Sequence, residues 1–210
     1  MKRTFLLLAA ACLLLCGCSK SHTATLAEDG GSVEVSEAGI GVTIPDGWSV
    51  YVGDDVYEQA FLNGSEDYSD ADEMKSVMET GGEYYIAYAV SGDGTAMAVV
   101  SAQDLSIGSD GEELEETVAA ADYARSVHDT TIFGYRASGY MTEGSFSEET
   151  MGGKSGWLSE FIVTDPEDGD FRLGQSEFMF EQDGTVFSIQ LVFSAEESER
   201  QAQMVTIYEL

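Results

Sequence analysis

Cysteine, basic residues, histidine and proline are all scarce in this chain of 210 residues. Its three cysteines lie within the first eighteen positions, it has two histidines and two prolines, and 9 Lys+Arg stand against 39 Asp+Glu, for a formal net charge of −30. Without a cysteine after Cys18, a cysteine nucleophile or a thiolate metal site is excluded from the body of the chain. The excess of acid excludes nonspecific binding to nucleic acid, because phosphates are bound by clustered Lys and Arg.

The chain does contain enough apolar material for one packed domain. Hydrophobic residues make up 43% of it and aromatic residues 10%, a composition that excludes a wholly disordered chain. A length of 210 residues is typical of one domain, or of two at most. We therefore expect a folded, strongly acidic body with no nucleic-acid partner.

The amino terminus has the features of an export signal. Met1-Lys2-Arg3 is a short basic region, and residues 5–15 are apolar throughout. As a helix this apolar stretch would rise about 16 Å, which is short of the roughly 30 Å hydrocarbon layer of a membrane. A basic start, a short apolar stretch and small residues after it indicate a signal peptide over residues 1–17, and not a membrane span.

The end of this signal resembles the lipobox of bacterial lipoproteins. Leu15-Cys16-Gly17-Cys18 presents an apolar residue, a small residue, glycine and then a cysteine. The resemblance implies that cleavage occurs before Cys18 and that Cys18 carries a diacylglycerol anchor and fatty acid such as palmitate. Leu13-Leu14-Leu15-Cys16 would make Cys16 the anchor instead, but it places bulky leucine where a small residue is preferred. Lipidation would also remove a reactive free thiol from an oxidising compartment.

Residues 18–38 predict an acidic flexible tether. They are rich in Ser, Thr, Gly and acidic residues and show no hydrophobic periodicity; the alternative is that Ser32–Val35 forms an edge strand. Loss of Lys2 and Arg3 with the signal lowers the formal charge from −30 to −32. We expect a domain anchored by lipid on the extracytoplasmic face of the cell membrane and held away from an anionic bilayer.

Turn residues, alternation and capping patterns predict the elements of the first half. The expected strands are residues 41–44, 49–52, 84–90 and 95–102, with turns over 45–48 and 91–94. The expected helices are residues 55–62, a helix capped within 69–72 that has Met74, Val77 and Met78 on one side, and a long helix capped by Ser109 and Glu112 that carries Leu114, Val118 and Ala121.

The second half is expected to be mainly strands. These are residues 132–141, 156–164, 172–181 and 185–193, with turns over 166–169 and 182–184. Ser194 and Glu197 form a capping box that predicts a closing helix to Leu210. Together the elements predict one α+β domain over residues 39–210, in which an antiparallel sheet is flanked by helices.

This order of elements resembles the PsbP-like fold, which occurs in many small bacterial lipoproteins. The resemblance lies in Val42-Thr43-Ile44-Pro45-Asp46-Gly47-Trp48 near the start and in the closing strand 185–193 with its capped helix, and it spans residues 39–210. Residues 64–82 fit the pattern least. The resemblance implies binding or assembly roles more often than catalysis, and it supplies no catalytic residues.

No histidine-based site is predicted. His22 lies in the expected tether and His128 after the expected long helix, so a histidine zinc site is not favoured. Residues 126–129, Ser-Val-His-Asp, contain the types of a hydrolase triad, but adjacent residues seldom converge as one. We expect His128 to be a helix-end histidine, favoured there by the helix dipole.

Three further patterns are interpreted as loops. Residues 152–155, Gly-Gly-Lys-Ser, end like a phosphate-binding loop, but the glycine required at position 148 is Glu148, so we expect a hairpin loop. The acidic stretches 66–73 and 165–170 offer oxygen ligands without the EF-hand spacing, so we expect solvated loops and keep a calcium site as the alternative. No catalytic, cofactor-binding or metal-binding residue is assigned.

We therefore expect a non-catalytic domain that binds a small ligand or assembles with an envelope protein. A ligand pocket should lie between sheet and helix and be lined by Tyr or Trp, whereas Trp48 and Trp157 are expected to pack in the core. The alternative is a carboxylate-based hydrolase acting on cell-wall polysaccharide, which would need two carboxylates facing each other across a cleft.

Overall fold

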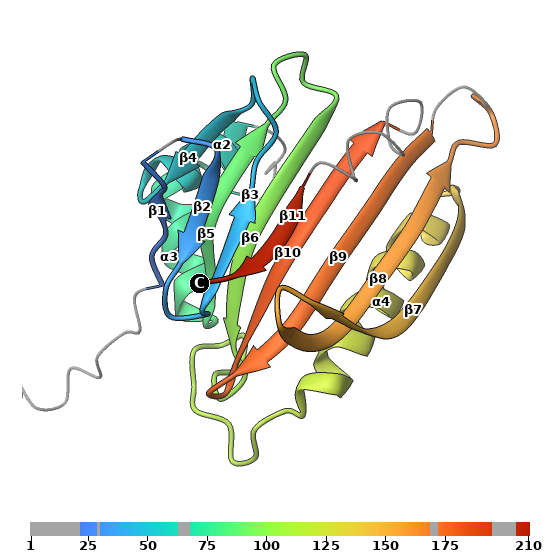
Figure 1. Cartoon of the computed structure of the whole chain (residues 1–210). Coiled ribbons are helices and arrows are strands. Elements are labelled where there is room, and N and C mark those ends of the chain that lie inside the picture. Colours follow the sequence, from blue (N-terminus) through green and yellow to red (C-terminus); the bar gives the residue numbers. More distant parts are fainter. Residues whose placement is uncertain (1–21, 29, 63–67, 169–171, 195–204) are drawn as a thin grey trace, which may run out of the picture.

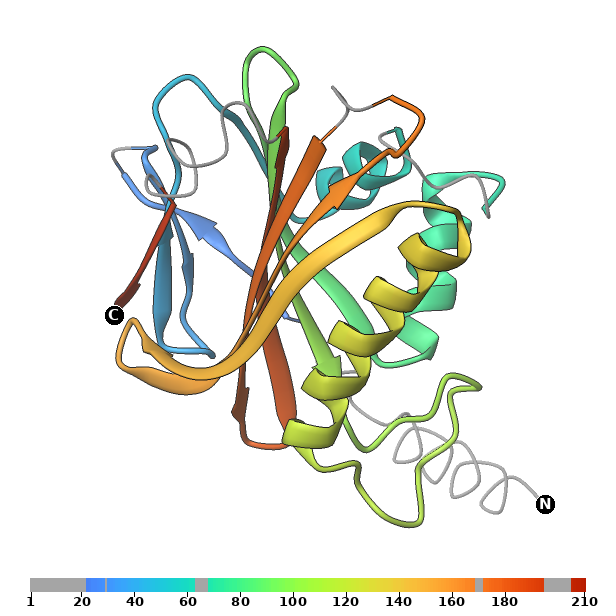
Figure 2. The same cartoon turned by 90° about the vertical axis from the view of Figure 1, so that its right-hand side faces the viewer.

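In the described part of the chain, a central antiparallel sheet separates a smaller sheet from three helices (Figure 2). The computed structural model describes residues 22–28, 30–62, 68–168, 172–194 and 205–210. The helices are α2 (Asp55–Leu62), α3 (Ala71–Thr80) and α4 (Ala120–Ala137). The strands are β1 (Thr25–Leu26), β2 (Ser32–Val35), β3 (Ile40–Thr43), β4 (Ser49–Val52), β5 (Glu83–Val90), β6 (Ala96–Asp104), β7 (Met141–Met151), β8 (Lys154–Thr164), β9 (Arg172–Gln182), β10 (Thr185–Ser194) and β11 (Thr206–Glu209).

The large sheet has seven strands in the order β4-β5-β6-β10-β9-β8-β7, and all its pairings are antiparallel (Figure 1). Three tight hairpins form most of it, and their turns lie where the sequence predicts them. Asp183 and Gly184 have positive φ angles of 52° and 80°, and Gly152 and Gly153 have 54° and 75°, as two-residue turns between twisted strands require. The α+β class and the antiparallel sheet flanked by helices are thereby confirmed.

The small sheet has the order β1-β2-β3-β11 and corrects the predicted tether. Strand β2 pairs with β3 along its whole length, and Val33 and Val35 are completely buried. It is an inner strand of the sheet, not the edge strand of the alternative. The predicted boundary at residue 39 is therefore wrong, because alternating valines in a short acidic stretch suffice to bury one face of a strand.

Even His22, the first described residue, belongs to the folded body and not to a tether. Its side chain is 4% exposed, its ring packs edge-on against Tyr84 and Phe187, and its Nδ1 lies 2.9 Å from Oε1 of Glu37. The ordered chain thus begins at least as early as residue 22.

The main core fills the space between the two sheets. Inward-facing residues alternate along the strands, so that Val33, Val35, Ile40 and Val42 of the small sheet meet large-sheet residues that include Ile86, Phe178, Phe180, Phe187, Ile189 and Leu191. Trp48 packs against this core, and Trp157 packs against a second cluster beneath α4, as expected for both.

The first two helices agree with the prediction. Helix α3 begins after Asp70, whose carboxylate accepts the N–H of Glu73 at 2.8 Å, and Gly81 ends it. Met74 and Met78 are buried, but Val77 is 52% exposed.

The third predicted helix is wrong in its position. Asp110 accepts the N–H of Glu112 at 3.2 Å within a turn, and residues 105–119 run as a loop held by bonds such as Leu114 N–H to Ser106 O at 2.8 Å. The helix itself begins at Ala120 and continues to Ala137, over much of the stretch 132–141 that was predicted as a strand. Packing of Ala124 and His128 on the sheet outweighs the β preference of the Thr-Thr-Ile-Phe run.

The predicted closing helix is also wrong where the structure describes it. Residues 206–209 form strand β11, which pairs antiparallel with β3. Residues 195–204 lie outside the described part. Among the described residues, no helix is long and apolar enough to cross a membrane.

Candidate functional site: a groove between the helices

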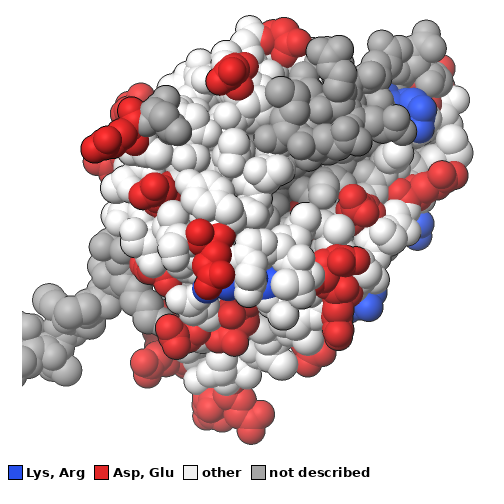
Figure 3. Space-filling model, in the orientation of Figure 1, with Lys and Arg blue, Asp and Glu red and all other residues white. Residues whose placement is uncertain are grey.

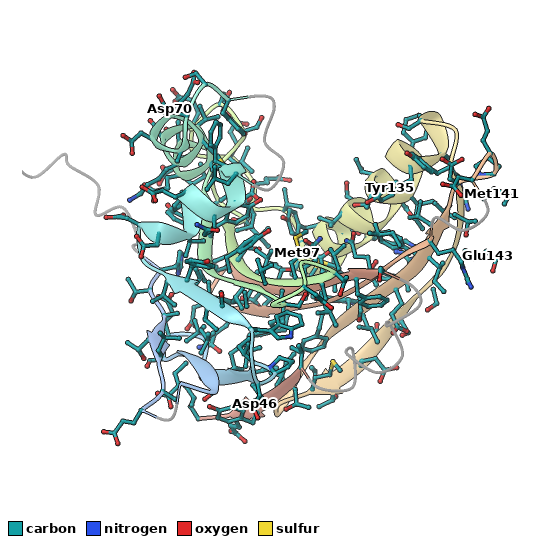
Figure 4. All side chains as sticks on the ribbon, turned by 90° about the horizontal axis from the view of Figure 1, so that it is seen from above. Asp46, Asp70, Met97, Tyr135, Met141 and Glu143 are labelled. Atoms are coloured by element: carbon teal, nitrogen blue, oxygen red, sulfur yellow. The ribbon has the colours of Figure 1, made fainter. Side chains whose placement is uncertain are left out.

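A groove lies on the helix-bearing face of the large sheet, between α2 and α3 on one side and α4 on the other. Figure 4 shows the two sets of helices standing apart above the sheet, with Met97 of β6 on the sheet between them and Tyr135 on α4. Two adjoining cavities occupy this place, an outer one of about 350 Å³ and an inner one of about 240 Å³, and both are lined by Glu83, Gln103 and Tyr123. We call them together the inter-helix groove.

The floor of the groove is polar, which is unusual for the middle of a sheet covered by helices. Alternation turns one face of β6, β9 and β10 towards the helices, and the polar residues on that face are Ser101, Gln103, Gln175, Glu177, Ser188 and Gln190. The opposite face of β10 is the apolar one that the sequence predicts. The signal for the polar floor was present in Ser188 and Gln190, but an isolated strand does not reveal whether its polar face meets water or a helix.

Glu177 is the most deeply buried acid of the floor. It is 7% exposed, and Ser188 Oγ donates to its Oε1 at 2.6 Å, while Gln175 and Gln190 also hydrogen-bond to it. Burial raises the pKa of this carboxyl, and the three hydrogen bonds oppose that rise only in part. Among the described residues no Lys, Arg or His forms an ion pair with Glu177.

A second acid, Glu83, stands at the start of β5 between the inner and outer cavities. Burial raises the pKa of its carboxyl, and the nearby charge of Glu177 adds to the rise. In the part of the chain that the structure describes, neither carboxyl forms an ion pair with a basic side chain, so a cation bound in this cavity would stabilise their ionised forms.

Tyrosines form the walls, as the sequence predicts for a pocket between sheet and helix. Tyr85 of β5 stacks on Tyr57 of α2 with ring centroids 5.8 Å apart, and the Tyr57 hydroxyl accepts the N–H of Tyr85 at 3.1 Å. Burial raises the pKa of Tyr85 to about 12 and also raises that of Tyr123. Both tyrosines are therefore neutral hydroxyl groups at physiological pH.

His128 lies near the middle of α4, not at a helix end as expected. It is 7% exposed, and its Nδ1 lies 2.8 Å from Oγ of Ser159, which is 1% exposed. Burial lowers the pKa of His128 and so favours the neutral ring. Because the hydroxyl that His128 meets is buried on β8, the serine, histidine and aspartate of residues 126–129 do not form a triad.

The other sequence patterns fall outside the groove. Residues 152 and 153 form the turn of the β7–β8 hairpin, and Lys154 Nζ donates to Gln182 Oε1 at 2.9 Å, so this segment is the hairpin loop that was predicted. Parts of both acidic stretches, and Cys18, lie outside the described residues. In the described part, no three His, Cys, Asp or Glu residues are grouped so as to hold a metal ion.

The surface around the small sheet carries scattered acids and few basic residues (Figure 3). Lys75 is one of the few cations near the groove, and it is engaged with Asp54 at 2.6 Å. The field of the molecule therefore attracts cations and repels anions over a wide area.

Comparison with known proteins gives likenesses of shape only. No protein-family model and no curated protein matches the sequence. The solution structure of cyanobacterial PsbP (CyanoP) from Synechocystis sp. PCC 6803 is similar at 11% identity and a TM-score of 0.46, covering 92% of this chain and 97% of that chain. LpqN, involved in cell envelope biogenesis of Mycobacterium tuberculosis, is similar at 15% identity and a TM-score of 0.40, with coverages of 80% and 83%.

A third similar structure is the Ran-binding protein Mog1p of Saccharomyces cerevisiae, at 11% identity and a TM-score of 0.41, with coverages of 87% and 84%. The first of the three bears the family name that the sequence resemblance suggested. With TM-scores of 0.46, 0.40 and 0.41, these likenesses carry no argument about what the chain does.

Proposed function

We propose that this chain is a lipoprotein anchored through Cys18 on the extracytoplasmic face of the cell membrane, and that its domain binds a small ligand in the inter-helix groove without catalysis. The groove is the observation that carries the proposal. Burying polar groups costs folding free energy, and here they gather on the floor of a concave site between helices. Concave sites with a few convergent polar groups are typical of ligand pockets.

The anchor is tested by replacing Cys18 with alanine. We expect Cys18→Ala to lose incorporation of labelled fatty acid and to leave the membrane fraction or remain unprocessed, whereas Cys16→Ala, the matched control, keeps both. Fatty acid that still attaches to Cys18→Ala and disappears in Cys16→Ala would move the anchor to Cys16. An intact, unacylated amino terminus on protein purified from its host would overturn the lipoprotein proposal.

The groove is tested by filling it. Ser101 lies on the floor of the inner cavity opposite Ser188 on the neighbouring strand, so Ser101→Leu replaces a hydroxyl with a larger branched apolar group there. We expect the fraction of a host envelope extract below about 1 kDa to slow amide hydrogen exchange in β6, β9, β10 and α4 of the wild type. Ser101→Leu should lose this protection while melting cooperatively. Equal protection of both proteins, or protection of neither, contradicts the proposed site.

A carboxylate-based hydrolase remains a second candidate, because Glu83 and Glu177 line the same cavity and the charge of Glu177 raises the pKa of Glu83. Such coupled carboxyls are used as acid and base in glycoside hydrolysis. Incubation with purified cell-wall polysaccharide separates the two functions. New reducing ends that appear with the wild type and not with Glu177→Gln would favour the hydrolase over the binding domain.

A further inference from the structure

We infer that the ligand of the inter-helix groove is a small organic cation of the ammonium type. Its charged end would lie against Glu177 in the inner cavity, and its aliphatic part against Val77, Leu114 and Val118 in the outer cavity. This inference rests on the proposed function, because it names the class of ligand that the same groove takes.

The first step concerns the missing countercharge. Glu177 is held in place by neutral donors, one of them the hydroxyl of Ser188 at 2.6 Å. An ionised carboxylate that is 7% exposed loses most of its hydration, its neutral donors compensate that loss only in part, and a nearby positive charge would stabilise it further. Two cationic side chains of the neighbouring helices are engaged elsewhere: Lys75 of α3 binds Asp54, and Arg125 of α4 lies 3.9 Å above the ring of Phe146.

The second step separates an organic cation from a metal ion. Calcium takes six to eight oxygen ligands, several of them usually carboxylates. The inner cavity offers two carboxyls, those of Glu83 and Glu177, and Asp104 of the outer cavity accepts the hydroxyl of Ser106 at 2.6 Å. No group of three metal-ligating acids, histidines or cysteines occurs among the residues that the structure describes. Tyr85 and Tyr123 line the same cavity, and tyrosine rings attract ammonium groups through their π faces.

The third step concerns the outer cavity. Val77 of α3 and Leu114 and Val118 of the 105–119 loop line it, and they are 52%, 39% and 42% exposed. Leu114 and Val118 reach the groove from this loop, whereas the sequence predicted that they would lie on a helix. Apolar side chains next to a charged inner cavity suit a ligand with an aliphatic part attached to its cationic end.

Choline and its neutral isostere 3,3-dimethylbutan-1-ol provide the test, because they share a shape and differ in charge. Binding to the full domain, residues 19–210, is measured by calorimetry and by NMR shifts of the groove tyrosines. We expect choline to bind at least tenfold more tightly than the isostere. Glu177→Gln should weaken choline binding at least tenfold. The matched control Glu160→Gln, which changes an exposed acid on β8, should leave choline binding unchanged.

Phosphatidylcholine vesicles form a second arm that identifies the source of the ammonium group. If the wild type is retained on these vesicles while it does not bind free choline, and Glu177→Gln abolishes that retention, the groove recognises the ammonium group of a lipid headgroup. Equal binding of choline and the isostere, unchanged binding by Glu177→Gln, or binding of neither probe with no retention would overturn the inference. The hydrogen-exchange experiment with envelope extract then decides whether the proposed function fails as well. The proposed function stands if the extract slows amide exchange in the wild type and not in Ser101→Leu. It fails together with the inference if the two proteins behave alike.

Discussion

Glu177 shows how a single position joins the sheet to the groove. Its cross-strand neighbours are Ser159 on β8 and Gln190 on β10, so a polar row runs across the sheet beneath α4. Ser159 is in turn paired with His128 of the helix. The row places each polar group beside a hydrogen-bonding partner, which limits the cost of burying it.

We expect Glu177→Gln to stabilise the fold at pH 7 to 8. The folded protein raises the pKa of Glu177 above the ordinary 4.5, so the folded state binds this proton more tightly than the unfolded state. The carboxyl therefore costs stability above its folded pKa and costs nothing below the unfolded value. Each kcal/mol gained raises the Tm by about 2 to 4 °C in a protein of this size.

Melting the two proteins from pH 4 to pH 8 checks this prediction. The gain from Glu177→Gln should shrink as the pH falls and vanish near pH 4, with Glu83, Tyr85 and Tyr123 as the other titratable groups at the site. Glu160→Gln should show no such trend. A loss of stability in Glu177→Gln that is equal at pH 4 and pH 8 would contradict the raised pKa.

The buried pair of His128 and Ser159 makes a second prediction at the residue scale. Ser159→Ala removes the partner of His128 Nδ1 and should cost about 1 to 3 kcal/mol, because the ring nitrogen stays buried without a hydrogen bond. The double variant, Ser159→Ala with His128→Leu, should lose less free energy of unfolding than the sum of the losses in the two single variants. Urea unfolding of the four proteins measures the coupling, and strict additivity would show that the pair is not a stabilising contact.

At the scale of elements, one of the cross-strand pairs between β11 and β3 links three strands of the small sheet. Tyr208 lies opposite Gly41 of β3, its ring covers the glycine, and its hydroxyl donates to Ser32 Oγ of β2 at 3.0 Å. One side chain thus spans three strands. Glycine at position 41 permits this, because a Cβ there would collide with the ring.

We expect Tyr208→Ala to lower stability by about 1 to 3 kcal/mol through lost ring burial and to speed amide exchange at Val42 and Ile207, which pair across the same strands. Tyr208→Phe keeps the ring and should lose only the free energy that the hydrogen bond to Ser32 contributes, about 0.5 to 1.5 kcal/mol. If Tyr208→Ala and Tyr208→Phe have equal effects, the hydroxyl and not the ring holds β11.

The hairpins and short helices could be predicted from the sequence because their signals are local. Gly152-Gly153 and Asp183-Gly184 can adopt positive φ, and Asp70 can cap a helix, wherever they stand. The capping pattern at Ser109 gave a wrong prediction because side chains accept backbone N–H groups in loop turns as well as at the first turn of a helix. Here Asp110 accepts the N–H of Glu112 in a loop. Strand β11 was missed because it needs β3, more than 160 residues away in the chain, to pair with.

At the scale of the whole molecule, the folded amino terminus brings the body close to its proposed anchor. His22, whose side chain is buried, follows Cys18 by four positions in the chain, and four extended residues reach at most about 14 Å. With the proposed anchor at Cys18, the body would lie beside the bilayer and would not be held away from it by a long tether.

This position predicts a dependence on lipid charge. The lipidated protein, with its excess of acid, should bind vesicles of phosphatidylglycerol more weakly than vesicles of phosphatidylcholine, because like charges repel across this short distance. In 1 M salt the Debye length falls to about 3 Å and the difference should disappear. Flotation assays measure it, and insertion of twenty Gly and Ser residues after Cys18 is the control that should reduce it. Equal binding at low salt would contradict the short connection.

The sequence by itself determined the acidity, the α+β class, the hairpins and the predicted site of lipidation, because composition, turns and short motifs act over a few residues. The tertiary structure decided that residues 32–35 and 206–209 join one sheet, that the long helix begins at Ala120, and that Glu177 is buried in a groove. Those outcomes depend on which distant surfaces meet. A polar side chain on a strand has the same local pattern whether a helix or water covers it, and only packing distinguishes the two.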